Sequence, residues 1–196
     1  MKRSKLAALL AFLACATAAY AQGPSKALFL IARPGMPDPN FRETVVLVTQ
    51  AEGAEATGVI INRPTNRSLA EMLPSERFKR FKEPIFFGGP VAPQGLFAVF
   101  QAEKFSGAVV TMLPGLYLAV VPDSIDALLN DPPPKIRFFA GYSGWAPGQL
   151  RGELDRGDWL VVDAEADAVF LKDTSRLWQD MVRRASAVRA DAASLR

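Results

Sequence analysis

Two arginines and two amides lie together directly after an apolar run, in the segment Asn62-Arg63-Pro64-Thr65-Asn66-Arg67. Guanidinium groups bind carboxylates and phosphates through paired hydrogen bonds, and amide groups add single donors. The segment is therefore a candidate site for a small anionic ligand, with Asn62, Arg63 and Pro64 as its first residues. The same residue types also cap strand ends and cover loops, so a structural role stays open.

The second candidate is a glycine-rich segment, Gly141-Tyr142-Ser143-Gly144-Trp145-Ala146-Pro147-Gly148-Gln149. Such a loop before a helix can present backbone N–H groups to an anion, or it can form a tight corner fixed by Trp145. Its spacing matches neither the P-loop nor the dinucleotide-binding pattern. Ser143 lacks the full G-x-S-x-G frame of serine hydrolases, because Trp145 stands where the second glycine belongs. The candidate binding residues of this segment are Ser143, Gly144, Trp145 and Gln149.

A third segment, Gly88-Gly89-Pro90, combines two residues that can take positive φ with a rigid one. By itself the pattern predicts a structural turn. Loops that follow strands carry binding residues more often than the strands do. We therefore place Gly88 and Gly89 with the two segments above on one expected working surface.

The alternative to a binding protein is an enzyme that uses carboxylates as acid or base. Asp38, Glu43 or Glu153 could act as acid or base if burial shifts a pKa. A carboxylate-based hydrolase is thus the second hypothesis, although no acid–base pair or nucleophile set can be assembled from the sequence. We assign no catalytic residue, no cofactor and, because no calcium-loop pattern occurs, no metal ligand.

The composition excludes further chemistry. The chain has 196 residues, 49% of them apolar, and contains no histidine, which excludes histidine-based triads and histidine-bound zinc. Its only cysteine is Cys15. Lys2, Arg3 and Lys5 account for the whole excess of 23 basic over 20 acidic residues. Because the remainder is electrically neutral, a nucleic-acid partner is not expected.

Residues 1–21 have the pattern of a cleavable export signal. The three basic residues precede the apolar stretch Leu6–Ala14, which is too short to remain as a membrane anchor. Ala19-Tyr20-Ala21 supplies the small residues of a cleavage site, so we predict cleavage after Ala21 and a periplasmic domain of residues 22–196. The alternative is a lipoprotein, since Phe12-Leu13-Ala14-Cys15 resembles a lipobox whose cysteine would be acylated.

Strands and helices interleave throughout the remaining chain, which favours an α/β or mixed α+β class. Short apolar runs predict strands at Ala27–Ala32, Thr44–Thr49, Thr57–Ile61, Pro84–Phe87, Gly95–Gln101, Val109–Leu113, Leu116–Val121, Ile136–Ala140 and Trp159–Val162. Helices are expected after the Ser68/Glu71 capping box, from Asp123 or Ser124 to Leu129, over Gly148–Leu154, and in an amphipathic C-terminal helix from Leu177. No repeat or linker interrupts this single domain.

Four segments resemble, in order, the signature blocks of the YqgE/AlgH family: residues 37–46 (PDPNFRETVV), 56–64 (ATGVIINRP), 87–91 (FGGPV) and 141–150 (GYSGWAPGQL). The resemblance covers roughly Leu28 to Trp178. It implies a single compact α/β (mixed α+β) domain with a mixed, partly barrel-like β-sheet flanked by helices. Family members are mostly uncharacterised, and one is named as a transcriptional regulator of alginate synthesis. Typical members lack an export signal, so this chain is expected to be an exported variant without a direct role at DNA.

The expected function is binding without catalysis, to a protein partner or a small anionic ligand. A third hypothesis is a membrane-surface envelope regulator. It rests on the export signal and on the basic C-terminal helix, or on lipidation at Cys15. Within that helix, however, Leu177, Trp178 and Met181 are better placed to cover the sheet than to face a membrane.

Overall fold

The computed structural model describes residues 26–49, 55–73 and 75–194, with side chains up to Val188. The predicted signal segment and Cys15 lie outside the described residues, so cleavage and lipidation stay predictions. No helix within the described ranges is both long and apolar enough to cross a membrane.

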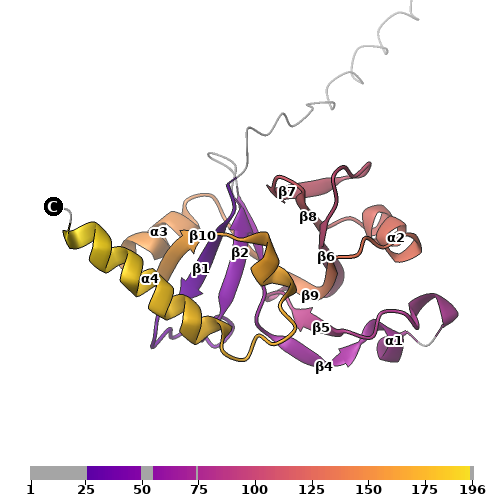
Figure 1. Cartoon of the computed structure of the whole chain (residues 1–196), viewed down its shortest axis with the longest axis horizontal. Helices are drawn as coiled ribbons and strands as arrows, with labels where there is room; N and C mark the ends of the chain where they lie inside the picture. Colours follow the sequence, from indigo (N-terminus) through magenta and orange to yellow (C-terminus); the bar gives the residue numbers. More distant parts are fainter. Residues whose placement is uncertain (1–25, 50–54, 74, 195–196) are drawn as a thin grey trace, which may run out of the picture.

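A curled and largely antiparallel sheet organises the chain (Figure 1). Its main order is β10-β1-β2-β3-β9-β6-β8-β7, and β4 and β5 join it beside β9. Only the β5–β9 pair is parallel among the described strands. The strands are β1 (Leu28–Ala32), β2 (Val45–Thr49), β3 (Ala56–Ile60), β4 (Pro64–Ser68), β5 (Pro84–Phe87), β6 (Val91–Gln101), β7 (Val109–Leu113), β8 (Leu116–Ala119), β9 (Ile136–Trp145) and β10 (Trp159–Asp163).

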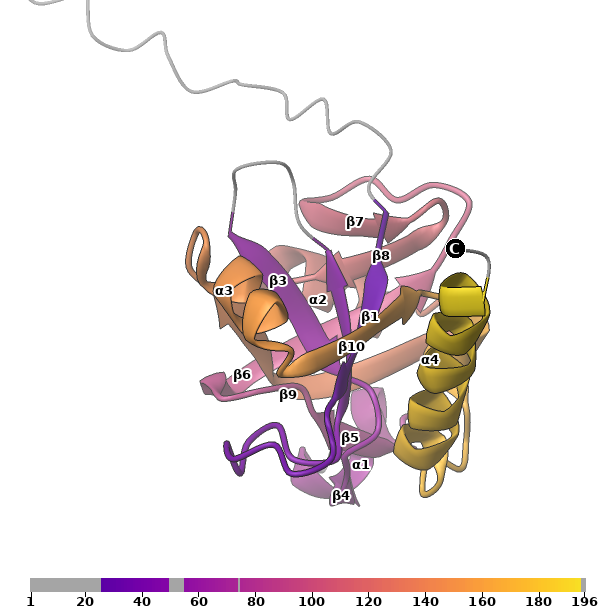
Figure 2. The ribbon, with the colours of Figure 1, turned by 90° about the vertical axis from the view of Figure 1, so that its left-hand side faces the viewer.

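Helices cover the sheet from different sides. They are α1 (Leu69–Met72), α2 (Pro122–Asn130), α3 (Gln149–Arg156) and α4 (Leu177–Ser194), with two short 3₁₀ turns, η1 (Glu76–Phe78) and η2 (Ala166–Phe170). Figure 2 shows α4 along one side of the molecule and α3 on another. This arrangement confirms the expected mixed α+β domain with a partly barrel-like sheet.

Alternation along β1 and β2 explains how the sheet buries both faces. Phe29 and Ile31 of β1 enter the core cluster that Leu177 and Met181 of α4 cover. The residues between them, such as Leu30, enter a second cluster with the tryptophans of the α3 corner. Successive side chains of a strand point to opposite faces, so a nearly continuous apolar run is what a doubly covered strand requires. A third cluster lies under α2.

Local signals proved reliable for α1 and misleading for α2. Ser68 and Glu71 form the predicted capping box, with each side chain bonded to the other's backbone N–H. In contrast, α2 begins at Pro122 without a side-chain cap, so the expected caps Asp123 and Ser124 were wrong. The Ser124 hydroxyl instead donates to the Ala108 carbonyl at 2.8 Å.

The segment after Asn62 is also a strand rather than the predicted loop. Pro64–Ser68 forms β4, which among the described strands pairs only with β5 and contains a register shift. Proline has no N–H to donate to a neighbouring strand, so it is tolerated at the first position of an edge strand such as β4. Pro64 itself is exposed.

Backbones cross closely where β5 ends beside β9. Gly88 accepts hydrogen bonds from Ile60 N at 2.9 Å and from the Ser143 hydroxyl at 3.0 Å. Gly141 has a φ of +71°, and a Cβ built there would lie 2.4 Å from the Gly89 carbonyl oxygen. The crossing therefore requires glycine for space as well as for conformation. Ser143 is fully buried in it, with its hydroxyl engaged.

We expect Gly141→Ala to destabilise the domain far more than Gly148→Ala. Both glycines have positive φ, but a Cβ at Gly148 would meet nothing within 4 Å. Gly148→Ala should thus introduce left-handed strain of about 1–2 kcal/mol and no clash. The lower freedom of alanine in the unfolded chain offsets about 0.5–1 kcal/mol of it. Gly141→Ala adds a backbone clash and should cost at least twice as much. Urea unfolding measures both, and equal losses would show that the close crossing is not required.

Candidate functional site

The loop between β1 and β2, residues 33–44, is here called the proline loop. Asn62, which directly follows the β3 region, fixes its end. The Asn62 Oδ1 accepts from Val45 N at 2.8 Å, and its Nδ2 donates to the Glu43 carbonyl at 2.9 Å. The amide therefore takes the place of a strand partner for backbone groups that the sheet leaves unpaired.

Arg63 fixes the rest of the proline loop. Its Nη1 donates to the Asn40 carbonyl at 2.6 Å, and its Nη2 donates to the carbonyls of Pro39 at 3.3 Å and Arg42 at 2.7 Å. Burial lowers the pKa of Arg63, while the nearby Asp38 and Glu43 carboxylates oppose that change. The guanidinium ends thus bind this chain's own backbone. Arg67, its expected companion, lies on β4 and does not line the same pocket.

Glu43 is held in an unusual conformation by these contacts. Its φ is +56°, a left-handed value that a residue with a side chain adopts at a cost. The residue is exposed, and in the part of the chain that the structure describes no cation forms an ion pair with its carboxylate. Strained residues of this kind cluster at ligand sites, which makes Glu43 a candidate binding residue.

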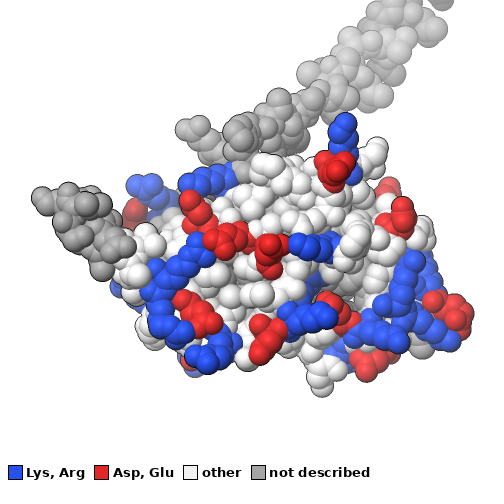
Figure 3. All heavy atoms as spheres, viewed as in Figure 1, with Lys and Arg blue, Asp and Glu red and all other residues white. Residues whose placement is uncertain are grey.

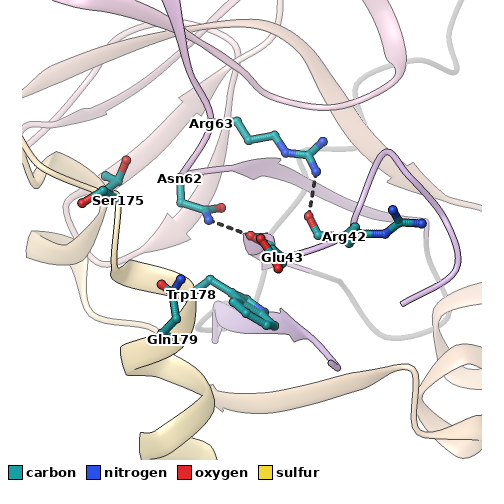
Figure 4. A pocket seen from close by; sticks show the side chains of 8 residues that line it. Arg42, Glu43, Asn62, Arg63, Ser175, Trp178 and Gln179 are labelled. Carbon is teal, nitrogen blue, oxygen red and sulfur yellow. Dashed lines mark hydrogen bonds between the residues drawn. The ribbon is translucent and has the colours of Figure 1, made fainter. Parts of the chain in front are cut away.

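A pocket of about 250 Å³ lies between the proline loop and the start of α4. Figure 4 shows the Glu43 side chain between Asn62 and Trp178, while the Arg42 guanidinium points away from Trp178. The Trp178 indole N–H donates to the Ala32 carbonyl at 2.8 Å, which fixes the ring as one wall. The lining residues are Arg42, Glu43, Asn62, Arg63, Thr174, Ser175, Trp178 and Gln179.

The start of α4 gives this pocket its polar wall. The first N–H groups of a helix have no acceptor within the helix, and those of Trp178 and Gln179 have no backbone acceptor among the described residues. Thr174 lies just before the helix and is 4% exposed. Within the described ranges its hydroxyl has no hydrogen-bond partner. Together with the dipole of an 18-residue helix, these donors favour an anionic group.

Arg137 holds the segment that leads into α4. It is 4% exposed, and its guanidinium lies 4.2 Å from the centre of the Phe86 ring. Its Nη1 and Nη2 donate to the carbonyls of Val169 at 2.6 Å and Leu171 at 2.8 Å. Burial lowers the pKa of Arg137, and Glu83 opposes that change. These bonds tie the η2 region to β9 and thereby position the first turn of α4.

The glycine-rich segment is strand β9 as far as Trp145, rather than the expected loop, and then forms the corner into α3. The indole N–H groups of Trp145 and Trp159 both donate to Glu153 Oε2, at 2.8 and 2.9 Å. Gln149 donates to Glu153 Oε1 at 3.0 Å and accepts from Ala146 N. Phe41 of the proline loop stacks on Trp145 with ring centres 5.9 Å apart. Trp145 thus anchors the turn from β9 into α3, with the polar groups of the corner used internally.

The expected working surface therefore divides into three places. Asn62 and Arg63 support the pocket, whereas Gly88, Gly89 and Ser143 are buried in the backbone crossing. Trp145 and Gln149 belong to the α3 corner, and Gly144 and Pro64 are exposed outside the pocket. Sequence reasoning missed Arg42, Thr174, Ser175, Trp178 and Gln179 as pocket residues. Only Trp178 carried a signal, as an aromatic on an amphipathic helix, and that signal indicated packing against the sheet.

The three carboxylates of the enzymatic hypothesis do not form one site. Glu153 is bonded within the α3 corner, and Glu43 lines the pocket. Asp38 accepts from Asn40 N at 2.8 Å in the proline loop. Within the described ranges no three Asp, Glu, His or Cys residues form a group that could hold a metal ion.

Comparisons with known proteins agree with this fold. A family model described as AlgH-like matches residues 29–188. The chain belongs to the AlgH-like family. A UPF0301 protein from Myxococcus xanthus, similar to this AlgH-like chain, is 37% identical over 162 residues, which are 79% of this chain and 87% of the relative.

Solved structures show the same AlgH-like architecture. The solution structure of the AlgH protein from Pseudomonas aeruginosa aligns with a TM-score of 0.66 at 31% identity, covering 80% of this chain and 87% of that one. A crystal structure of a protein from Corynebacterium diphtheriae gives a TM-score of 0.65 at 24% identity, covering 83% and 87%, and supports the fold alone.

We expect Glu43→Gly to stabilise this AlgH-like domain slightly and Glu43→Ala to leave its stability nearly unchanged. Glycine removes left-handed strain of about 1–2 kcal/mol and loses about 0.5–1 kcal/mol through greater freedom of the unfolded chain. Alanine keeps the strain. Thermal unfolding of both variants measures the difference. A Glu43→Gly variant less stable than Glu43→Ala would contradict the assignment of strain to this residue.

Proposed function

We propose that this AlgH-like domain is a periplasmic, non-catalytic binding protein that takes an anionic group into the pocket between the proline loop and α4. The group belongs to a small ligand or to a protein partner. The observation that carries the proposal is the polar wall at the start of α4, where Thr174, Trp178 and Gln179 line one pocket. The N–H groups of Trp178 and Gln179 have no backbone acceptor within the described ranges.

The dimensions of the pocket support a small ligand. Its volume of about 250 Å³ lies below the range of about 300–1,000 Å³ that is usual for drug-sized ligands. A dinucleotide or a folded nucleic-acid segment would not fit such a space. Basic and acidic side chains also intermingle on the face shown in Figure 3, which is not the concentrated basic surface that nucleic acid requires.

The distribution of polar groups favours binding over catalysis. General acid–base catalysis needs a proton-transferring group beside the reacting atoms, and hydrolysis usually needs a second group to activate water. The pocket contains one carboxylate, Glu43, and two guanidinium groups that stay protonated at neutral pH. A fixed indole and oriented donors are sufficient to hold a ligand but do not assemble a proton relay.

Acetate and inorganic phosphate are suitable probes of this proposal. We expect either anion, added at millimolar concentration, to shift the backbone amide resonances of Trp178 and Gln179 in ¹⁵N-correlated NMR spectra. Thr174→Val keeps the shape of the buried side chain but removes its hydroxyl. It should weaken binding about tenfold, which corresponds to one hydrogen bond of about 1.4 kcal/mol.

Ser186→Ala is the matched control, because it removes a hydroxyl from the same helix, outside the pocket, that donates to Val182 O at 2.9 Å. It should leave anion affinity unchanged. If neither anion moves the amide resonances of the first turn of α4, the proposed site is wrong. Equal losses for Thr174→Val and Ser186→Ala would also count against it.

A further inference from the structure

The pocket contains a carboxylate, Glu43, that forms no ion pair with any described residue, and this charge shares the space with the proposed anion-binding wall. Glu43 comes from the proline loop, while Thr174 and Ser175 come from the start of α4, and all three line the same space. In Figure 4 the Glu43 side chain and Ser175 lie on different sides of the volume above Trp178. A simple anion would be attracted by one wall and repelled by the other.

The neighbouring charged residues leave the charge of Glu43 without a direct ion-pair partner among the described residues. Arg63 lies close enough to Glu43 for their charges to interact, but the two form no ion pair within 4 Å, and Asp38 also acts on Arg63. The Arg63 nitrogens Nη1 and Nη2 are bound to three backbone carbonyls. Arg63 therefore does not neutralise Glu43 directly, and the carboxylate keeps its capacity to accept hydrogen bonds.

The conformation of Glu43 supports a positive role for its side chain. Glycine would occupy a φ of +56° without strain, yet a charged residue stands there. The Asn62 amide donates to the Glu43 carbonyl at 2.9 Å and so holds the residue in this position. Trp178 lines the same pocket as Glu43, and an ammonium group over an indole face gains cation–π attraction.

We infer that the ligand is a zwitterion of the α-amino acid class, with its carboxylate at the start of α4 and its ammonium group at Glu43. This inference rests on the proposed function and adds the second charge to it. A free amino acid carries both groups on one carbon, which suits a pocket of about 250 Å³. A peptide chain separates its two charged ends by at least one further residue.

Matched probes separate the two charges. L-phenylalanine, 3-phenylpropanoate and 2-phenylethylammonium share one skeleton and differ in the presence of the ammonium or carboxylate group. L-alanine, propanoate and ethylammonium form a smaller set of the same design. Isothermal titration calorimetry, with the amide resonances of Trp178 and Gln179 as a local readout, measures the affinity of the domain for each compound.

We expect the amino acid of at least one set to bind at least tenfold more tightly than either of its single-charge analogues. Glu43→Gln should abolish that advantage while leaving carboxylate affinity unchanged or higher, because a repelling charge is removed. Glu103→Gln is the control: it makes the same chemical change at an exposed residue outside the pocket. L-alanyl-L-alanine should bind more weakly than L-alanine.

The remaining outcomes distinguish the two levels of the proposal. Equal binding of amino acid and carboxylate would overturn the zwitterion while leaving the anion site intact. Preferential binding of the ammonium compounds would overturn both, since it would leave the start of α4 without a role. No binding by any probe would refute the proposed function and the inference with it. Tighter binding of the dipeptide would replace the free amino acid with a peptide end.

Discussion

The hydrogen bonds from Asn62 and Arg63 to the proline loop are the constraint on which the pocket depends. A loop with three prolines between residues 33 and 44 cannot satisfy its backbone by pairing in a sheet, since each proline lacks an N–H. Two side chains that follow β3 bind five backbone groups of this region directly. Asn62 and Arg63, which the sequence suggests as ligand-binding residues, thus stabilise the loop that carries Glu43.

The opposite wall depends on a second arginine, Arg137, which is buried, whereas Arg63 is half-buried. Arg137 binds two carbonyls of the segment before α4, and Trp178 then ties the first turn of α4 to the Ala32 carbonyl at the end of β1. A buried guanidinium is expensive to desolvate, and both arginines offset this cost mainly with backbone carbonyls instead of carboxylates. Each wall of the pocket is therefore held by hydrogen bonds from an arginine to backbone carbonyls. These bonds are present without a ligand.

Sequence reasoning reached the features that local patterns encode. The apolar alternation of β1 and β2, the Ser68–Glu71 capping box and the amphipathic face of α4 each follow from spacing within a few residues. The role of Arg63 could not be found in this way, because its acceptors are carbonyl oxygens about 20 residues earlier, and every residue type has a carbonyl. The pocket joins that loop to a helix more than 130 residues later, so no spacing links Glu43 with Thr174.

Glu153 and Glu43 differ in whether their carboxylate oxygens are used within the fold. Glu153 accepts from two indole N–H groups and a glutamine amide, so its oxygens are committed to joining the α3 corner to β10. Glu43 has a strained backbone, exposure and no ion pair among the described residues. If Glu43 served stability alone, glycine or asparagine would fill its conformation at lower cost. Its charge therefore stays available to a group outside the chain, and Glu43 lines the pocket.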